Sequence, residues 1–146
     1  MTLQGQEKRN IKVTLHTKIT HGRETESYEL ITFGTLLSKG SDIYIQYREE
    51  NEAGTVQTTI KHKPHETLLL RSGSVKMRQL FRLQEKTNGQ YESVYGILGL
   101  TTTATKIDHT WNERLKEGKL SLRYQMHMQG GSPGKYELTI SYREEV

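Results

Sequence analysis

The chain has 146 residues, a formal net charge of +4 and no cysteine. This length suits one domain with a hydrophobic core, and the lack of cysteine excludes disulfide bonds and cysteine-ligated metal centres. Hydrophobic residues make up 32% and charged residues 26%, which is typical of a well-solvated β protein rather than a thick α/β core. The sequence shows neither the apolar run of a signal peptide nor a stretch of membrane-span length, so we expect a cytoplasmic protein.

The first part of the chain alternates apolar and polar residues with the period of two that is typical of β-strands. The first nine residues are mostly polar, and we expect residues 1–9 to form a flexible arm before a single barrel domain over residues 10–146. Gly34 lies inside an apolar run, where it indicates a bend, a bulge or a close backbone approach. Strands are expected at 11–19, 28–38, 43–48 and 56–60, with turns at 21–27, 39–42 and 49–54.

The middle of the chain continues this pattern through shorter segments. A turn at 62–66 leads into apolar runs at 67–71 and 75–83. In the second run, Gln79 shares a face with apolar side chains. An Asn-Gly pair follows, and because this dipeptide is the strongest short-range hairpin signal, we predict a turn at 86–90.

The last third contains the most regular alternation. Strands are expected at 91–98, 100–108, 119–128 and 136–143, with a turn at 130–134. The segment HTWNERLKEG at 109–118 fits two structures: a single helical turn ending at Gly118 and packed through Trp111 and Leu115, or a long hairpin loop. Both alternatives stay open at the level of sequence.

These segments amount to nine or ten sequential strands joined mostly by short turns, which favours an up-and-down antiparallel sheet. A twisted sheet of this size tends to curl, and closure removes its exposed edges. We therefore predict an all-β, antiparallel up-and-down β-barrel of eight to ten strands, closed or nearly closed, in preference to a sandwich.

Three sequence blocks support this prediction through a resemblance. The blocks are YIQYRE at 44–49, RSGSVKM at 71–77 and YGILGLTTTATKI at 95–107. They resemble the YwiB-like family of uncharacterised bacterial proteins, and the similarity extends from about residue 11 to residue 142. The resemblance implies a calycin fold, that is, a lipocalin-like antiparallel β-barrel. It implies no reaction, cofactor or functional residue.

Residues able to carry catalysis do not form a recognisable pattern. The acid pairs 49–50 and 144–145 lie at strand exits, where carboxylates are normally solvated rather than held in a cleft with a perturbed pKa. His62 and His65 flank a proline and are expected to be exposed turn residues, since a zinc site needs further ligands. No nucleophile elbow or phosphate-binding glycine loop is present. We therefore expect a protein that is not an enzyme and needs no cofactor or metal.

The predicted barrel interior is the leading candidate for function. Polar residues interrupt its apolar rows, and such groups can orient a small ligand in an apolar pocket. We therefore predict a binding barrel for a small apolar or amphipathic ligand. The alternative is a core filled by its own side chains, with the polar groups satisfied internally. The candidate ligand-binding residues are Gln79, Tyr95, Lys106, Tyr124 and Met126.

A basic segment at 61–86 supports a second hypothesis. Alternation directs its cations to the outer face of the sheet, where they could contact RNA or another acidic partner. The segment lacks the interleaved aromatic residues of single-strand binding surfaces, so an ordinary solvated face is favoured. No membrane partner is expected, and no oligomeric state is predicted. The candidate anion-binding residues are Lys61, Lys63, Lys76, Arg78 and Arg82.

Overall fold

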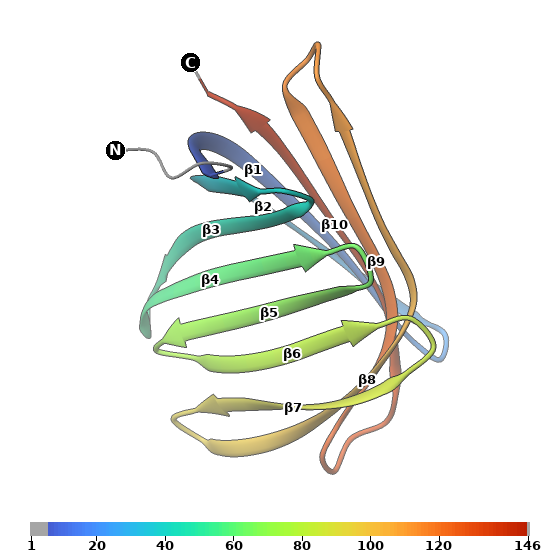
Figure 1. The fold of residues 1–146 in the computed structure, drawn as a ribbon. Helices are drawn as coiled ribbons and strands as arrows, with labels where there is room; N and C mark the ends of the chain where they lie inside the picture. The colour runs from blue at the N-terminus through green and yellow to red at the C-terminus, as the bar shows by residue number, and fades with distance from the viewer. Residues whose placement is uncertain (1–5, 146) are drawn as a thin grey trace.

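Ten antiparallel strands form a closed barrel in residues 6–145, the part of the chain that the computed structural model describes (Figure 1). The predicted all-β barrel is confirmed. No helix in these residues is long and apolar enough to cross a bilayer. The strands are β1 (Gln6–His21), β2 (Glu24–Lys39), β3 (Asp42–Asn51), β4 (Gly54–Lys63), β5 (Glu66–Gly73), β6 (Lys76–Arg82), β7 (Lys86–Ser93), β8 (Gly96–Asn112), β9 (Glu117–Met128) and β10 (Gly134–Glu144).

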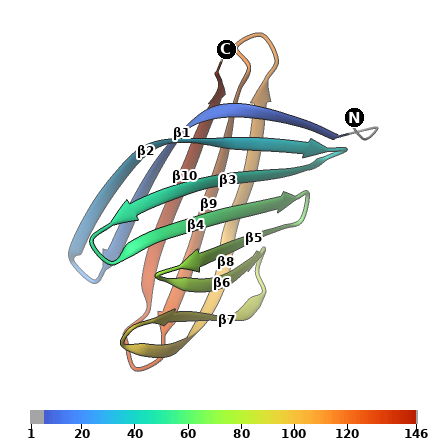
Figure 2. The same ribbon diagram turned by 90° about the vertical axis from the view of Figure 1, so that its left-hand side faces the viewer.

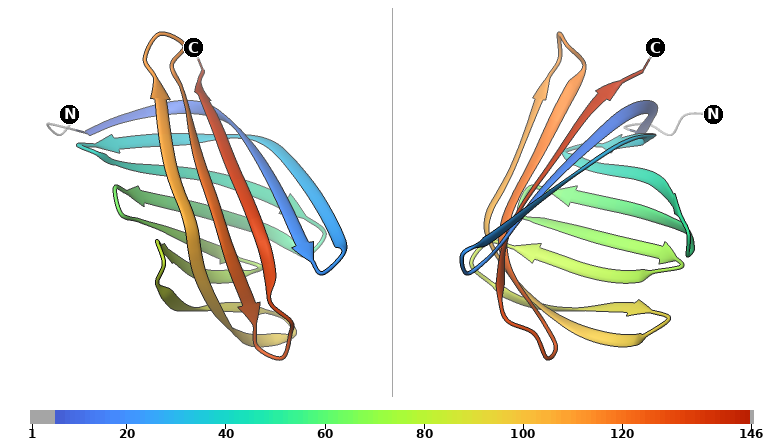
Figure 3. Two further views of the ribbon diagram at one scale, coloured as in Figure 1. Left: turned by 90° about the vertical axis from the view of Figure 1, so that its right-hand side faces the viewer. Right: turned by 180° about the vertical axis from the view of Figure 1, so that it is seen from behind.

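Each strand pairs with its neighbours in sequence, and the pairing of β1 with β10 closes the barrel. The strands of one wall, β3 to β7, cross those of the other wall, β8 to β10, at a steep angle (Figures 1 and 2). The long strand β8 bends and reaches both walls (Figure 3). Because the chain runs up and down, the turns after β1, β3, β5, β7 and β9 all lie at one end of the barrel.

Strict alternation directs one face of each strand into a shared core. In β9, for example, Leu120, Leu122 and Tyr124 are buried while the residues between them are exposed or half-buried. A single cluster of buried apolar side chains takes members from both walls. Phe81 of β6 meets Tyr124 of β9 edge to face, with ring centroids 4.7 Å apart, so the two walls are in direct contact at this level.

Two glycines allow strands to approach closely. A Cβ atom at Gly34 would overlap the backbone oxygen of Gln46 on β3, which confirms the close approach expected there. Gly89 is different, because the sequence predicts a turn at this residue and the structure places it inside β7. A Cβ at Gly89 would overlap the backbone oxygen of Arg78 on β6. The glycine is thus needed for strand packing, and the predicted Asn-Gly turn is wrong.

Other predicted boundaries also change. Residues 6–9 are part of β1 and pair with residues 36–39 of β2, so the predicted arm is wrong for these four residues; residues 1–5 lie outside the described part of the chain. The predicted turn at 21–27 shortens to the two residues between β1 and β2. The segment 109–118 forms neither a helical turn nor a long loop, since β8 and β9 extend to a short turn at 113–116.

Candidate ligand-binding site

Three of the five predicted ligand-binding residues lie in the barrel interior. Gln79, Tyr124 and Met126 are all buried. The Gln79 side-chain amide donates a hydrogen bond to Thr102 Oγ1 at 3.0 Å, and the same nitrogen lies 3.1 Å from the sulfur of Met126. The amide nitrogen of Gln79 therefore has hydrogen-bond partners within the protein. At this level of the barrel, the interior is filled by its own side chains, which was the alternative to a ligand cavity.

The other two residues are not in the interior, and their predicted placement is wrong. Tyr95 is 96% exposed because β7 ends at Ser93 and Tyr95 lies in the turn that follows. Lys106 points outward because a β-bulge between Ala104 and Lys106 shifts the register of β8. One extra residue reverses the inward and outward faces of the rest of the strand.

A second group of interior polar residues was not predicted. Tyr47, Thr58 and Arg71 are successive cross-strand partners on β3, β4 and β5. Only 2% of Tyr47 and 0% of Thr58 are exposed, although both carry a hydroxyl group. The Tyr47 hydroxyl, Thr58 Oγ1 and Arg71 Nε are buried without a hydrogen-bond partner in the described part of the chain. We refer to these three residues as the inner polar row.

The charge of Arg71 influences both walls of the barrel. Its Nη2 atom lies 3.8 Å from Glu49 Oε1, which is too long for a hydrogen bond. Burial raises the pKa of Tyr47, and the Arg71 charge and the adjacent polar groups of Thr58 and Arg71 oppose that rise, although their geometry falls outside that of a hydrogen bond. Burial likewise raises the pKa of Tyr124 on the opposite wall, again opposed by Arg71. The charge of the guanidinium therefore acts on phenol groups that belong to two different walls.

Apolar side chains continue the inner polar row toward the end of the barrel. The register carries on from Arg71 to Met77 of β6, Tyr91 of β7 and Leu98 of β8. Each of the three is only partly covered. They lie beside the β5–β6 and β7–β8 turns, and we call them the mouth residues. Arg71 is thus placed just inside an apolar rim.

The opposite end of the barrel is filled by aromatic and histidine side chains. His62 is only 6% exposed, so its predicted exposure is wrong; His65 is exposed as expected. His62 Nδ1 lies 2.8 Å from Thr67 Oγ1, and His109 Nε2 lies 2.6 Å from the Tyr142 hydroxyl. Burial lowers the pKa of both histidines. Because these ring nitrogens have partners, this end serves as a structural plug.

Metal binding receives no support from these side chains. In residues 6–145, no three His, Cys, Asp or Glu residues are arranged to hold a metal ion.

The two predicted acid pairs lie in two different environments. The second residue of each pair, Glu50 or Glu145, is exposed. The first residues are half-buried in ion pairs, Glu49 with Arg71 and Glu144 with Arg9, the latter at 3.3 Å.

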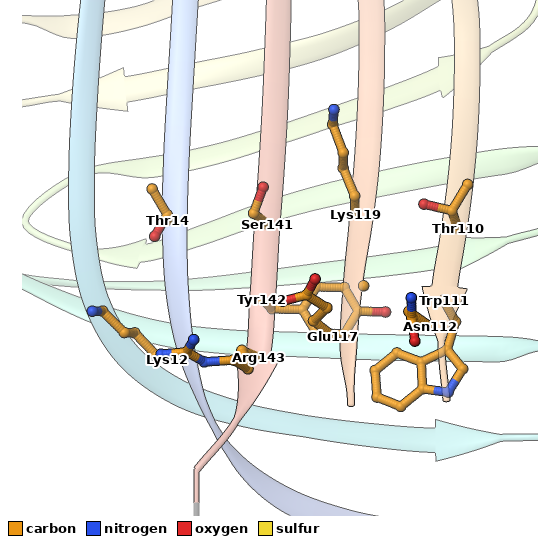
Figure 4. A pocket seen from close by; sticks show the side chains of 11 residues that line it. Lys12, Thr14, Thr110, Trp111, Asn112, Glu117, Lys119, Ser141, Tyr142 and Arg143 are labelled. Atoms are coloured by element: carbon orange, nitrogen blue, oxygen red, sulfur yellow. The ribbon is translucent and has the colours of Figure 1, made fainter. Parts of the chain in front are cut away.

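The largest pocket described lies on the outer face of β1, β10, β9 and β8 and has a volume of about 630 Å³. Figure 4 shows its side chains, which come from four adjacent strands. Lys12 and Arg143 are cross-strand partners on its floor, and Lys119 lies two strands from Lys12. The charge at this surface is mainly positive, with Glu117 as the acidic member.

The predicted basic face on β4 and β6 points outward, but ion pairs neutralise part of it. Lys76 lies 3.8 Å from Glu92, and Arg82 lies 3.4 Å from Glu66. Half-buried leucines of β5 and β6 separate the cations. The predicted outward direction is therefore correct, whereas Lys76 alone of these cations lines one of the pockets found in the described residues, and its ion-pair partner Glu92 lines the same pocket.

Ten sequentially paired strands around a shared core define the class of this protein as an antiparallel up-and-down β-barrel. The chain belongs to the family described as "Domain of unknown function (DUF1934)", which matches residues 13–140. It is 33% identical over 137 residues to "Uncharacterized beta-barrel protein YwiB" of Bacillus subtilis (strain 168), covering 92% of this chain and 95% of that protein. The predicted similarity to the YwiB-like family is thus confirmed.

A solved structure gives the same result for the fold. The crystal structure of the YwiB protein from Bacillus subtilis matches this barrel with a TM-score of 0.86 at 29% sequence identity. The match covers 97% of this chain and 96% of that chain. The descriptions of these relatives name no ligand and no reaction, so any function must be argued from the residues.

Proposed function

We propose that this protein is a non-enzymatic binding barrel whose interior holds a small amphipathic ligand by its anionic head group. The observation that carries the proposal is the inner polar row: the Tyr47 hydroxyl, Thr58 Oγ1 and the Nε atom of half-buried Arg71 are buried atoms without hydrogen-bond partners in the described residues. Each buried polar group left unsatisfied costs about 1–3 kcal/mol. A ligand that accepts hydrogen bonds from all three would remove this cost.

The chemistry of the row favours an anion. A guanidinium binds carboxylate or phosphate oxygens through charge-assisted, often bidentate hydrogen bonds. The Tyr47 and Thr58 hydroxyls can donate to the same oxygens. Glu49 lies too far from Arg71 for a hydrogen bond, so the guanidinium retains donors for a ligand.

The surroundings of the row favour an apolar tail on the same ligand. The mouth residues Met77, Tyr91 and Leu98 supply an apolar rim, and a methionine side chain adapts readily to new shapes. Arg71 lines neither the large outer pocket nor any of the three smaller pockets found in the described residues. The ligand therefore enters by displacing mouth side chains, which are already partly exposed.

Titration with two probes of equal chain length tests the proposal. Dodecanoate has the anionic head group, whereas dodecanol does not. We expect the wild-type protein to bind dodecanoate more tightly, and Arg71→Met to lose at least about tenfold in affinity for dodecanoate only. Arg78→Met is the matched control, because Arg78 is exposed on the outer face of the neighbouring strand.

Two results would overturn the proposal. One is dodecanoate affinity that is the same in Arg71→Met and wild type, which would place the head group elsewhere. The other is a wild-type protein that binds neither probe. Circular dichroism of each variant establishes that a loss of binding does not come from unfolding.

A further inference from the structure

We infer that the outer face of β8, β9, β10 and β1 is a binding groove for the phosphate backbone of a nucleic-acid strand. Three adjoining pockets make up this groove. The pocket in Figure 4 shares Lys119 with a second pocket of about 210 Å³. That pocket in turn shares Lys18, Arg123 and Glu137 with a third of about 310 Å³. The three hollows therefore form one continuous outer groove along the strands.

The outer groove is strongly basic. Seven cations and the two acids Glu117 and Glu137 line it, so its formal charge is seven minus two, or +5. Arg123 pairs with Glu137 at 3.1 Å; the other six cations have no ion pair within 4.0 Å among residues 6–145. The seven cations are Lys12, Lys18, Lys106, Lys119, Arg123, Lys135 and Arg143.

The register places these cations in four of five successive outward rows, and the middle row of His16, Thr139, Ser121 and Asp108 contains no lysine or arginine. Outward residues recur every second position, so successive rows lie about 6.6 Å apart along the strands. One row runs from Lys18 through the acid Glu137 of β10 to Arg123 and Lys106, while the next row contains Lys135. This spacing resembles that of successive phosphates along an extended nucleic-acid strand. Hydroxyl groups between the cations, such as those of Thr14 and Ser141, supply further phosphate donors.

The shape and composition of the groove favour a nucleic acid over other anionic partners. A flat anionic bilayer does not fit into an elongated hollow. The exposed apolar side chains nearest to the groove, Ile31 and Phe33, lie outside it on β2, beside Thr14 and Lys12. Aromatic side chains reach the groove only near its two ends, through Trp111 and Tyr142 at one and Tyr124 and Tyr136 at the other. The groove therefore has no row of aromatic rings on which successive bases could stack. We expect its cations to contact the phosphate backbone and the protein to show weak sequence preference.

Fluorescence anisotropy with a labelled single-stranded RNA of about 20 nucleotides tests the inference. The groove variant K106Q/K119Q/K135Q removes three cations that make no ion pair. The matched control K61Q/K63Q/K86Q removes three lysines of the opposite wall that likewise make no ion pair in the described residues. We expect the groove variant to lose at least about tenfold in affinity and to lower the slope of log affinity against log salt by about 2. The control retains most of its affinity.

Several outcomes would overturn the inference. These are equal losses in the two variants, an unchanged salt slope in the groove variant, and no binding of RNA by the wild-type protein. Binding of anionic vesicles that RNA does not displace would identify a membrane as the partner and would also refute it. Dodecanoate affinity is expected to be the same in both lysine variants and in the wild type. A failure of the RNA-binding test therefore leaves the proposed interior site unaffected, and a failure of the dodecanoate test leaves the groove unaffected. The single variant K119Q serves if the triple variant does not fold.

Discussion

Tyr142 lies across β9 because its cross-strand partner, Gly118, has no side chain. A Cβ atom at Gly118 would overlap the Cζ atom and the hydroxyl oxygen of Tyr142. In this position the Tyr142 hydroxyl reaches His109, and its ring stacks on Trp111 with centroids 6.0 Å apart. The plug at this end of the barrel therefore depends on a glycine in the neighbouring strand.

Gly118→Ala is expected to destabilise the protein by about 1–3 kcal/mol, because the added methyl group displaces the Tyr142 ring from a packed site. Urea denaturation measures the change in the free energy of unfolding. Gly99→Ala is the control, since a Cβ at Gly99 meets no atom closer than 3.7 Å. Equal destabilisation by the two substitutions would mean that loss of glycine in a strand, and not the contact with Tyr142, is the cause.

Two tyrosine-to-phenylalanine substitutions separate stability from binding. Tyr142→Phe removes the partner of His109 Nε2 and is expected to cost about 1 kcal/mol. Tyr47→Phe removes a buried hydroxyl that has no partner in the described residues, so its effect on the free energy of unfolding is expected to be neutral or stabilising. Dodecanoate affinity is expected to fall only in Tyr47→Phe. A large loss of stability in Tyr47→Phe would show that its hydroxyl is already satisfied in the free protein.

The buried histidines predict a pH-dependent stability. Burial lowers the folded-state pKa of His62 and His109 from the ordinary value of 6.5; a charge on His109 lowers the pKa of His62 further, and Asp108 partly opposes the shift of His109. Below pH 6.5 the unfolded chain therefore binds more protons than the folded protein, so the free energy of unfolding falls as the pH falls. We expect urea denaturation to show lower stability at about pH 5.5 than at about pH 7.5.

Replacement of His109 tests the origin of this pH dependence. His109→Asn is expected to be less stable overall but to show a shallower change between the same two pH values. His65→Asn is the control, because His65 is exposed in the β4–β5 turn. If His109→Asn keeps the full wild-type slope, other groups must be responsible for the pH dependence.

Alternation was sufficient to predict the barrel, because period-two patterning directly reports which face of a strand is buried. The strands β9 and β10 follow it throughout. The Asn-Gly pair at 88–89 misled the prediction, since the same glycine that favours a turn also permits the close approach of Arg78. Local sequence does not distinguish these two roles of glycine.

The site was harder to predict than the fold. The bulge after Ala104 turned Lys106 outward, and the end of β7 placed Tyr95 in a turn; neither event has a clear signal in the sequence. The inner polar row was missed because its members are distant in sequence and meet only through strand register. Arg71 does continue the parity of the buried residues Thr67 and Leu69, and this pattern would have placed it inside.

A crystal structure of the protein with dodecanoate is the most direct test of the claim that the inner polar row is an anion site. We expect the carboxylate oxygens to lie within about 3.2 Å of the Arg71 guanidinium and the Tyr47 hydroxyl, with the alkyl chain against the mouth residues. The claim would be contradicted by a crystal grown with saturating dodecanoate in which the interior stays closed and dodecanoate binds only to the outer surface.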